Sequence, residues 1–188
     1  MVGIPRALYP LMSMCSPTRL FVIPSAVTGF RVTPSFGLER LSSVSTGGGS
    51  AAHAAVHHSG KWLAVAHHGL PPTHTVGKSG SVAIVSLAAD GTPLEQVALV
   101  IHPTETDPKL LADPGRSDWT SHAHSVNYDS TGKWLFVCEK GLDRVYVYTF
   151  DEATGTIAHH SECMTPIGNA ARHLAVHPNV RFRLVFDC

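Results

Sequence analysis

The chain has 188 residues, of which 44% are hydrophobic and 15% are charged, so it can bury a core and does not belong to the disordered class. Lys and Arg total 14, as do Asp and Glu, and this balance creates no overall charge that would recruit nucleic acid or an anionic membrane. No stretch reaches the roughly 18 apolar residues of a membrane-spanning helix, so we expect neither a nucleic-acid nor a membrane partner.

The N-terminal segment, residues 1–25, is expected to be irregular, and residues 26–188 are expected to fold as one unit. Prolines interrupt any helix in this segment at Pro5, Pro10, Pro17 and Pro24. The arginines that precede the first acidic residue, Glu39, are a weak feature of targeting segments, and we favour the irregular interpretation.

The four cysteines form no CxxC pair, which argues against both a zinc site and a disulfide framework. They are Cys15, Cys138, Cys163 and Cys188. A reducing compartment fits this pattern, and we expect a cytoplasmic location.

The sequence contains an internal repeat. Residues 53–65 are echoed by residues 124–137, with one extra residue in the turn, and a third copy covers residues 173–185. Gly60 and Gly132 mark the turn in the first two copies, whereas Val180 stands at this position in the third, where a valine at positive φ would be strained.

A second, alternating motif follows the first two copies, at residues 80–87 and 143–150, with a weaker relative at residues 29–32. In the second of these, β-branched and aromatic residues alternate strictly, which is typical of a strand. Each unit therefore predicts a four-stranded antiparallel sheet, and no window has the period of a helix. Repeats of this kind at irregular spacing indicate the blades of a β-propeller with variable loops.

Three segments resemble the lactonase family of seven-bladed β-propellers, which includes propeller-type 6-phosphogluconolactonases and carboxymuconate cyclases. The segments are Ser121–Val126, Gly141–Tyr148 and Ala171–Asn179. The resemblance implies an all-β fold with about three of seven four-stranded blades: the rear of the first, the whole second and third, and the opening of the fourth. We therefore expect an N-terminal fragment of a ring, whose exposed blade edges favour self-association.

The resemblance also implies an activity, namely metal-independent hydrolysis of a sugar lactone without a cofactor. The expected substrate is the small anionic lactone 6-phosphogluconolactone, which is converted to 6-phosphogluconate in the pentose phosphate pathway by a parent protein of which this chain is a portion. One alternative is a carboxy-cis,cis-muconate cycloisomerase. The other is a noncatalytic, truncated propeller that acts as a binding scaffold.

Lactone hydrolysis requires a base for water, donors for the developing oxyanion and an anchor for an anionic substrate. Residues two apart on a strand share a face, so His122 and His124 are expected to lie together beside Arg172 and His173 from the next blade. The resemblance assigns catalytic roles to His124, as the base, and to Arg172, which would bind a phosphate or carboxylate. We expect His122, His173 and Glu139 to bind substrate.

Structural roles remain open for several of these residues. His53 and His173 occupy equivalent repeat positions, and recurrence in every blade favours a packing role. An ion pair is the alternative for Arg172. The Asp143–Arg144 pair is interpreted as fixing a turn between two strands.

The chain also departs from the family pattern. Asp187-Cys188 stands where family members commonly carry Asn-Glu, so the catalytic glutamate of the cyclases is missing and the cyclase alternative is weakened. His67-His68 replaces the usual Asn-Tyr after the second-blade strand. There is no GxSxG elbow, and Cys138 lies in an apolar strand, so we expect no covalent nucleophile.

Paired histidines raise the question of a metal site. They occur at 57–58, 67–68 and 159–160. Adjacent strand residues point to opposite faces, so each pair is expected to offer only one ligand. His122 and His124 form the better two-ligand candidate, but no third ligand accompanies them, and no bound metal is expected.

Overall fold

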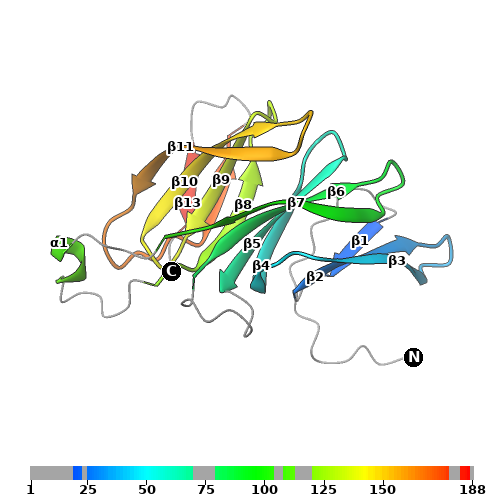
Figure 1. Ribbon diagram of the computed structural model, residues 1–188, viewed down its shortest axis with the longest axis horizontal. Coiled ribbons are helices and arrows are strands. Elements are labelled where there is room, and N and C mark those ends of the chain that lie inside the picture. The colour runs from blue at the N-terminus through cyan, green and yellow to red at the C-terminus, as the bar shows by residue number, and fades with distance from the viewer. Residues whose placement is uncertain are drawn as a thin grey trace.

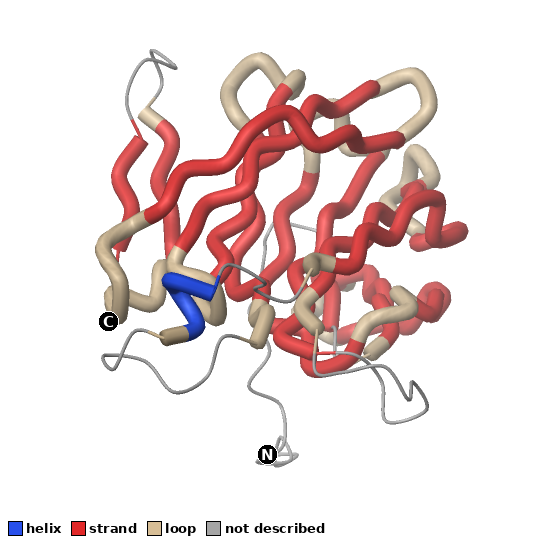
Figure 2. The backbone as a smooth tube through the Cα atoms, turned by 60° about the vertical axis from the view of Figure 1, so that its left-hand side comes forward, coloured by secondary structure: helices blue, strands red, loops and turns tan. Residues whose placement is uncertain are grey.

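The computed structural model describes residues 19–22, 25–69, 79–103, 108–112, 120–177 and 183–186, and most of this backbone is strand (Figures 1 and 2). In these ranges the single helix is the short α1 (Pro108–Leu111). No helix in the described part of the chain is long and apolar enough to cross a bilayer. The expectation of an all-β chain with very little helix is therefore confirmed.

In the described ranges, four antiparallel sheets follow one another along the chain, and two of them are four-stranded meanders. The first sheet contains β1 (Arg19–Val22), β2 (Ala26–Val32) and β3 (Leu38–Ser45); the second contains β4 (Gly49–Val56), β5 (Trp62–Gly69), β6 (Ser81–Leu87) and β7 (Pro93–Ile101). The third contains β8 (Ala123–Tyr128), β9 (Trp134–Glu139), β10 (Arg144–Asp151) and β11 (Thr156–Met164), and the fourth pairs β12 (His173–Val176) with β13 (Arg183–Phe186). This arrangement is the expected partial β-propeller.

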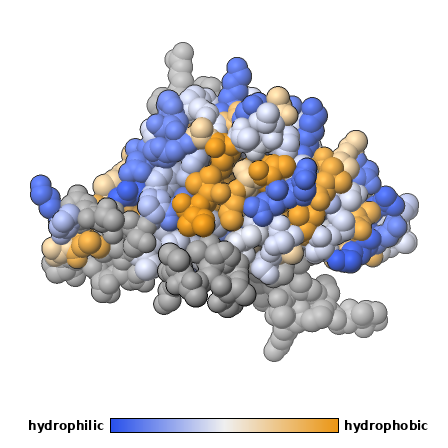
Figure 3. Space-filling model, in the orientation of Figure 1, coloured by the Kyte–Doolittle hydropathy of each residue, from blue (hydrophilic) through white to orange (hydrophobic). Residues whose placement is uncertain are grey.

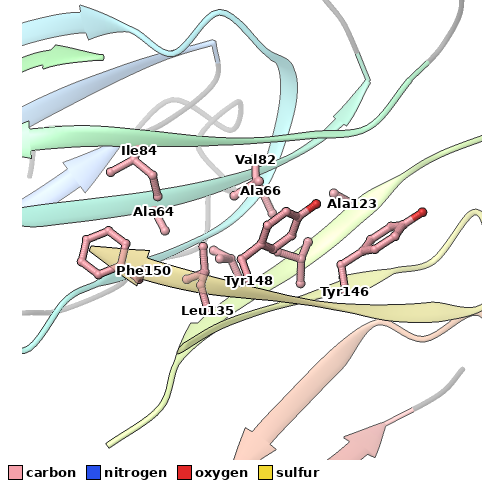
Figure 4. Close-up of a cluster of buried hydrophobic side chains, with 11 residues drawn as sticks. Ala64, Ala66, Val82, Ile84, Ala123, Leu135, Tyr146, Tyr148 and Phe150 are labelled. Atoms are coloured by element: carbon pink, nitrogen blue, oxygen red, sulfur yellow. The ribbon is translucent and has the colours of Figure 1, made fainter. Parts of the chain in front are cut away.

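The central strands of the second sheet, β5 and β6, are buried on both faces because the sheet lies between two others. In β5, Leu63 and Val65 pack toward the first sheet with Val27, whereas Ala64 and Ala66 belong to the cluster shared with the third sheet. Figure 4 shows this second cluster, in which the aromatic rings of β10 lie across from the small side chains of β5. Alternate residues of one strand thus supply two separate cores, as a stack of blades requires.

The turns of the repeat have equal length in the second and third sheets. Val56 pairs with Leu63 and Tyr128 pairs with Leu135, and the turn glycines Gly60 and Gly132 have φ values of 74° and 71°. The expectation of one extra residue in the later turn is therefore wrong. In the strand register, His53 is equivalent to Ser125, and His124 is equivalent to Ala52.

Two further expectations concern the ends of the chain. The segment 1–25 was expected to be irregular, but β1 lies inside it and pairs with β2, because the run Leu20-Phe21-Val22 has strand-forming residues between Pro17 and Pro24. The strained valine expected at 180 and the departure at 187–188 lie outside the described residues.

The far face of the third sheet, on the side of β12, carries an apolar cavity. Its volume is about 460 Å³, and its lining includes Trp134, Phe136, Val147 and Leu174. Apolar side chains also gather at the centre of the face seen in Figure 3.

Candidate functional site

Five histidines gather where the innermost strands of successive sheets lie side by side. Strand β8 contacts β4, β5 and β12, so residues from three sheets meet at this point (Figure 1). We call the group the histidine cluster; it contains His53, His68, His122, His124 and His173. The ring centroids of His68 and His122 are 4.5 Å apart and stacked, and those of His124 and His173 are 5.0 Å apart. The predicted gathering of His122, His124, Arg172 and His173 is present in the structure.

The central contact of the cluster joins His124 to Arg172. The Arg172 Nε–H donates a hydrogen bond to His124 Nε2 over 3.0 Å. Because a guanidinium is only a donor, His124 Nε2 must be the acceptor, and the neutral ring therefore carries its proton on Nδ1. That Nδ1 is buried and has no hydrogen-bond partner among the described residues.

The surroundings of His124 keep its ring neutral. Burial lowers the pKa of His124 to about 4, and the positive charges of Arg172 and Lys140 and the neighbouring rings of His173 and His68 add to this effect. Burial, the neighbouring His122 and the same two cations also lower the pKa of His68 to about 4. At neutral pH both rings are uncharged, and the positive charge of the site resides on Arg172 and Lys140.

His122 is held by hydrogen bonds at both ring nitrogens. Its Nδ1 donates to the His68 carbonyl over 2.7 Å, and its Nε2 lies 2.9 Å from Thr120 Oγ1. The side chain thus links the end of β5 to the start of β8. Its predicted contact with substrate stays a prediction.

His53 and His173 lie on the other side of His124. The side chain of His173 is exposed, and its ring centroid lies 6.4 Å from that of His53. His53 Nδ1 accepts a hydrogen bond from the Val126 backbone over 3.4 Å, and burial followed by the neighbouring His173 lowers the pKa of His53. His53 therefore ties β4 to β8, whereas His173 is accessible to a ligand.

Glu139 lies beneath the cluster, with no exposed surface. Its Oε1 accepts the Ser121 hydroxyl over 2.9 Å, and its Oε2 accepts the Leu142 amide over 2.9 Å. Burial raises the pKa of Glu139 to about 7, although the hydrogen bonds that it accepts oppose this rise. Both carboxylate oxygens are engaged by the protein's own donors, and the predicted contact with substrate stays a prediction.

Two residues of the site, His68 and Lys140, were not predicted from the sequence. They occupy equivalent positions in β5 and after β9, each directly before a glycine, Gly69 or Gly141. His124 and Arg172 also occupy equivalent positions. Each follows a buried alanine, Ala123 or Ala171, and each is followed two residues later by a buried aliphatic residue, Val126 or Leu174. Aligning the repeat without the extra turn residue would have revealed both pairs.

The residues whose geometry could hold a metal ion lie outside the histidine cluster. Among the described residues, the group whose ligand atoms lie within 4.8 Å of one another is His57, His58 and Glu152. The expectation that a histidine pair offers only one ligand is wrong here, because His58 lies in a turn and the two rings are 4.1 Å apart. His57 Nδ1 accepts the Ser59 amide, however, and His57 Nε2 lies 3.2 Å from the Gly132 carbonyl, so this histidine is already engaged in the turn packing.

The fold and this cluster define a class of protein: a β-propeller with a cationic, histidine-lined site where its innermost strands meet. The family described as "Lactonase, 7-bladed beta-propeller" matches residues 16–186, and the chain belongs to this family. No curated protein matches its sequence significantly.

Solved structures agree with this assignment. The chain is similar to the periplasmic gluconolactonase PpgL of Pseudomonas aeruginosa, with 26% identity and a TM-score of 0.71 over 91% of this chain and 48% of that one. It also resembles, in fold, a proposed 6-phosphogluconolactonase of Bacteroides fragilis, with 16% identity and a TM-score of 0.68 over 90% of this chain and 47% of that one. The chain therefore spans about half the length of the structures that it matches.

The Pseudomonas enzyme corrects one expectation. A cytoplasmic location was expected from the cysteine pattern, and it is contradicted because the similar gluconolactonase is periplasmic. Among the described cysteines, Cys138 and Cys163 are free thiols, and two free thiols do not identify a compartment.

Proposed function

We propose that this chain carries the water-activating part of a sugar lactonase, with His124 as the general base and Arg172 as the anchor for an anionic substrate. The observation that carries this proposal is the hydrogen bond from Arg172 Nε–H to His124 Nε2, 3.0 Å long, inside a site that holds two cations. Family membership and the similar gluconolactonase support the reaction class.

The base and the anchor are coupled through this hydrogen bond. In the free protein, Arg172 occupies the lone pair of His124 Nε2 and its charge opposes protonation of the ring. An anionic substrate that binds the guanidinium neutralises this charge and draws the donor away from the ring. His124 then becomes a stronger base at the moment when substrate is present.

The chemical steps follow from these positions. His124 Nε2 takes a proton from water while the water oxygen forms a bond to the lactone carbonyl carbon. Arg172 is engaged by the anionic group of the substrate, so the second cation, Lys140, stabilises the oxyanion that results. When the tetrahedral intermediate collapses, the ring C–O bond breaks, and the leaving alkoxide takes the proton back from His124. The products are a hydroxy acid and a regenerated neutral histidine.

The charge of the site selects among sugar lactones. Arg172 and Lys140 both act on His124 and His68, whereas the carboxylate oxygens of Glu139 are engaged by Ser121 and Leu142. A substrate with a phosphate would pair with these cations, and a neutral lactone would not. We therefore propose 6-phosphogluconolactone as the preferred substrate over unphosphorylated gluconolactone.

Steady-state kinetics on these two lactones test the proposal. The wild-type chain should have a kcat/KM at least about 10-fold higher for the phosphorylated lactone, and Arg172→Lys should raise the KM for that substrate while leaving the KM for gluconolactone nearly unchanged. Arg40→Lys, at an exposed position of β3 in the first sheet, is the matched control and should change neither value. Equal KM values for Arg172→Lys and the wild type would reject the anchor role.

A further inference from the structure

We propose that the β9–β10 turn, residues 139–143, is a positioning element that holds His124 and Arg172 in contact. Glu139 at its start binds the segment that leads into β8, and Asp143 at its end binds the loop that leads to Arg172. The catalytic importance of this contact rests on the function proposed above, but the positioning can be tested without any activity.

Glu139 fixes the side of the site that carries His122 and His124. Its carboxylate accepts the Ser121 hydroxyl and the amides of His122, Gly141 and Leu142. The Lys140 amide also donates to the His122 carbonyl over 3.1 Å. One buried carboxylate therefore joins the turn to the two residues that precede β8.

The second sheet uses the same position in the same way. His67 is equivalent to Glu139, is fully buried, and places its Nε2 2.8 Å from Thr46 Oγ1 in the segment before β4. A side chain at Gly48 would collide with the His67 ring, so this segment packs directly on the histidine. In both sheets, a buried polar side chain at the end of the second strand binds the segment that precedes the first strand. This recurrence supports a positioning role for Glu139.

Asp143 fixes the opposite side of the site. It is fully buried and has a φ of 50°, which turns its carboxylate toward the loop between β11 and β12. Its Oδ2 accepts the Gly168 amide over 2.8 Å, and its Oδ1 accepts the Ala170 amide over 2.6 Å. The sequence pattern indicated that Asp143 fixes a turn between two strands, and its carboxylate binds the loop between β11 and β12, which leads into the next sheet.

The loop that Asp143 binds leads directly to Arg172. Only Ala171 separates Ala170 from the arginine, and Ala171 is itself fully buried against the third sheet. Two carboxylates four positions apart in sequence thus hold the two segments whose side chains meet at the His124–Arg172 hydrogen bond. In this proposal Glu139 and Asp143 act as positioning residues through the two segments that their carboxylates bind.

The test of Asp143 uses the pKa of His124, measured by NMR titration of the ring. Arg172→Gln removes the positive charge beside His124 and should raise its pKa toward 6.5. Asp143→Gly removes both acceptors without adding backbone strain at positive φ, and it should raise the His124 pKa in the same direction by a similar amount. Asp143→Asn keeps one acceptor and should give a smaller rise.

Asp151 provides the matched control, because it is an aspartate at the other end of β10 that also accepts a backbone amide, from Ala153. Asp151→Asn should leave the His124 pKa unchanged. A folded Asp143→Gly protein whose His124 pKa equals that of the wild type would overturn the role of Asp143.

Amide hydrogen exchange tests the role of Glu139 in the positioning element. Glu139→Ala should accelerate exchange of the Leu142 and Lys140 amides by about 10-fold or more, and Glu139→Gln, which can still accept the amide hydrogen bonds, should restore most of the protection. Unchanged exchange rates of these amides in Glu139→Ala would reject the positioning role of Glu139. If these measurements succeed while the wild-type chain hydrolyses no lactone, the proposed function fails and the positioning element stands.

Discussion

His124 and Arg172 occupy equivalent positions in successive blades, and the side chain of one donates a hydrogen bond to the other over 3.0 Å. A repeat protein thus places two different residues at one repeat position and brings them into contact where the blades meet. The neighbouring pair His68 and Lys140 follows the same rule, and both members act on His124.

Binding of an anion should change the protonation of His124. Addition of the product 6-phosphogluconate should raise the His124 pKa from about 4, because the ligand neutralises the charge of Arg172. NMR titration with and without the ligand measures this change. Arg172→Gln should abolish the response to the ligand, and a wild-type pKa that is insensitive to saturating ligand would contradict the coupling.

The stability of the protein should fall on mild acidification. Burial lowers the pKa of His67 to about 4 and that of His102 to about 3, so between pH 6.5 and 4 the unfolded chain binds protons that the folded chain does not bind. The free energy of unfolding therefore decreases as the pH falls through this window, by at most about 1.4 kcal/mol per pH unit for each such group. Urea unfolding at several pH values measures the slope.

His102→Phe isolates one contribution to this slope. The His102 ring is buried against Tyr146, and neither of its nitrogens has a hydrogen-bond partner in the described part of the chain. A phenylalanine of similar shape should therefore be tolerated and should flatten the dependence of stability on pH. An unaltered slope would show that His102 is protonated equally in the folded and unfolded states.

Gly141, the glycine of the positioning element, should be more sensitive to substitution than the equivalent Gly69. A Cβ at this position would collide with the Thr120 carbonyl oxygen and lie 2.8 Å from the His122 amide. Gly141→Ala should therefore destabilise the fold by roughly 1–3 kcal/mol. At the equivalent Gly69 no described atom lies within 4 Å of such a Cβ, so Gly69→Ala should have little effect on urea unfolding. Equal stabilities of the two variants would contradict this packing.

Much of the fold could be predicted from the sequence because the repeat and the strict alternation of residues 143–150 are local signals. The missed strand β1 has only 4 residues and stands between prolines, where no repeat marks it. The misaligned repeat has a specific cause: His53 and His124 share a residue type but occupy neighbouring repeat positions. The β-bulges and the turns lie at equivalent places in the two sheets, so His53 is equivalent to Ser125 and no residue is inserted.

The site was only partly predictable. His124 and Arg172 were found because the family motifs contain them, whereas Lys140 and His68 carry no motif. The roles of Glu139 and Asp143 depend on which backbone amides their carboxylates reach. For Asp143 these belong to a loop 25 and 27 positions away, and no local pattern in the sequence encodes such a contact.

Self-association, expected from the exposed blade edges, stays a prediction. Leu174 of the two-stranded fourth sheet lines the apolar cavity on the far face of the third sheet, so a second copy that pairs with the edge of the fourth sheet would also cover the cavity. Light scattering should then give a molar mass of about twice 20.1 kDa. Val147→Glu, in the cavity wall, should yield the monomer, and Thr149→Glu, exposed on the same strand, should not. A wild-type mass of 20.1 kDa would contradict the expectation.

The most direct test of the proposed function is the rate of 6-phosphogluconolactone hydrolysis by the 188-residue chain and by His124→Ala, each corrected for spontaneous hydrolysis. Circular dichroism should confirm that both proteins are folded. We predict that the wild type accelerates hydrolysis and that the variant loses at least about 100-fold of this activity, the usual contribution of a general base. Equal rates for two folded, active proteins would contradict the assignment of His124 as the base, and a folded wild type without activity would contradict the proposed function of this chain.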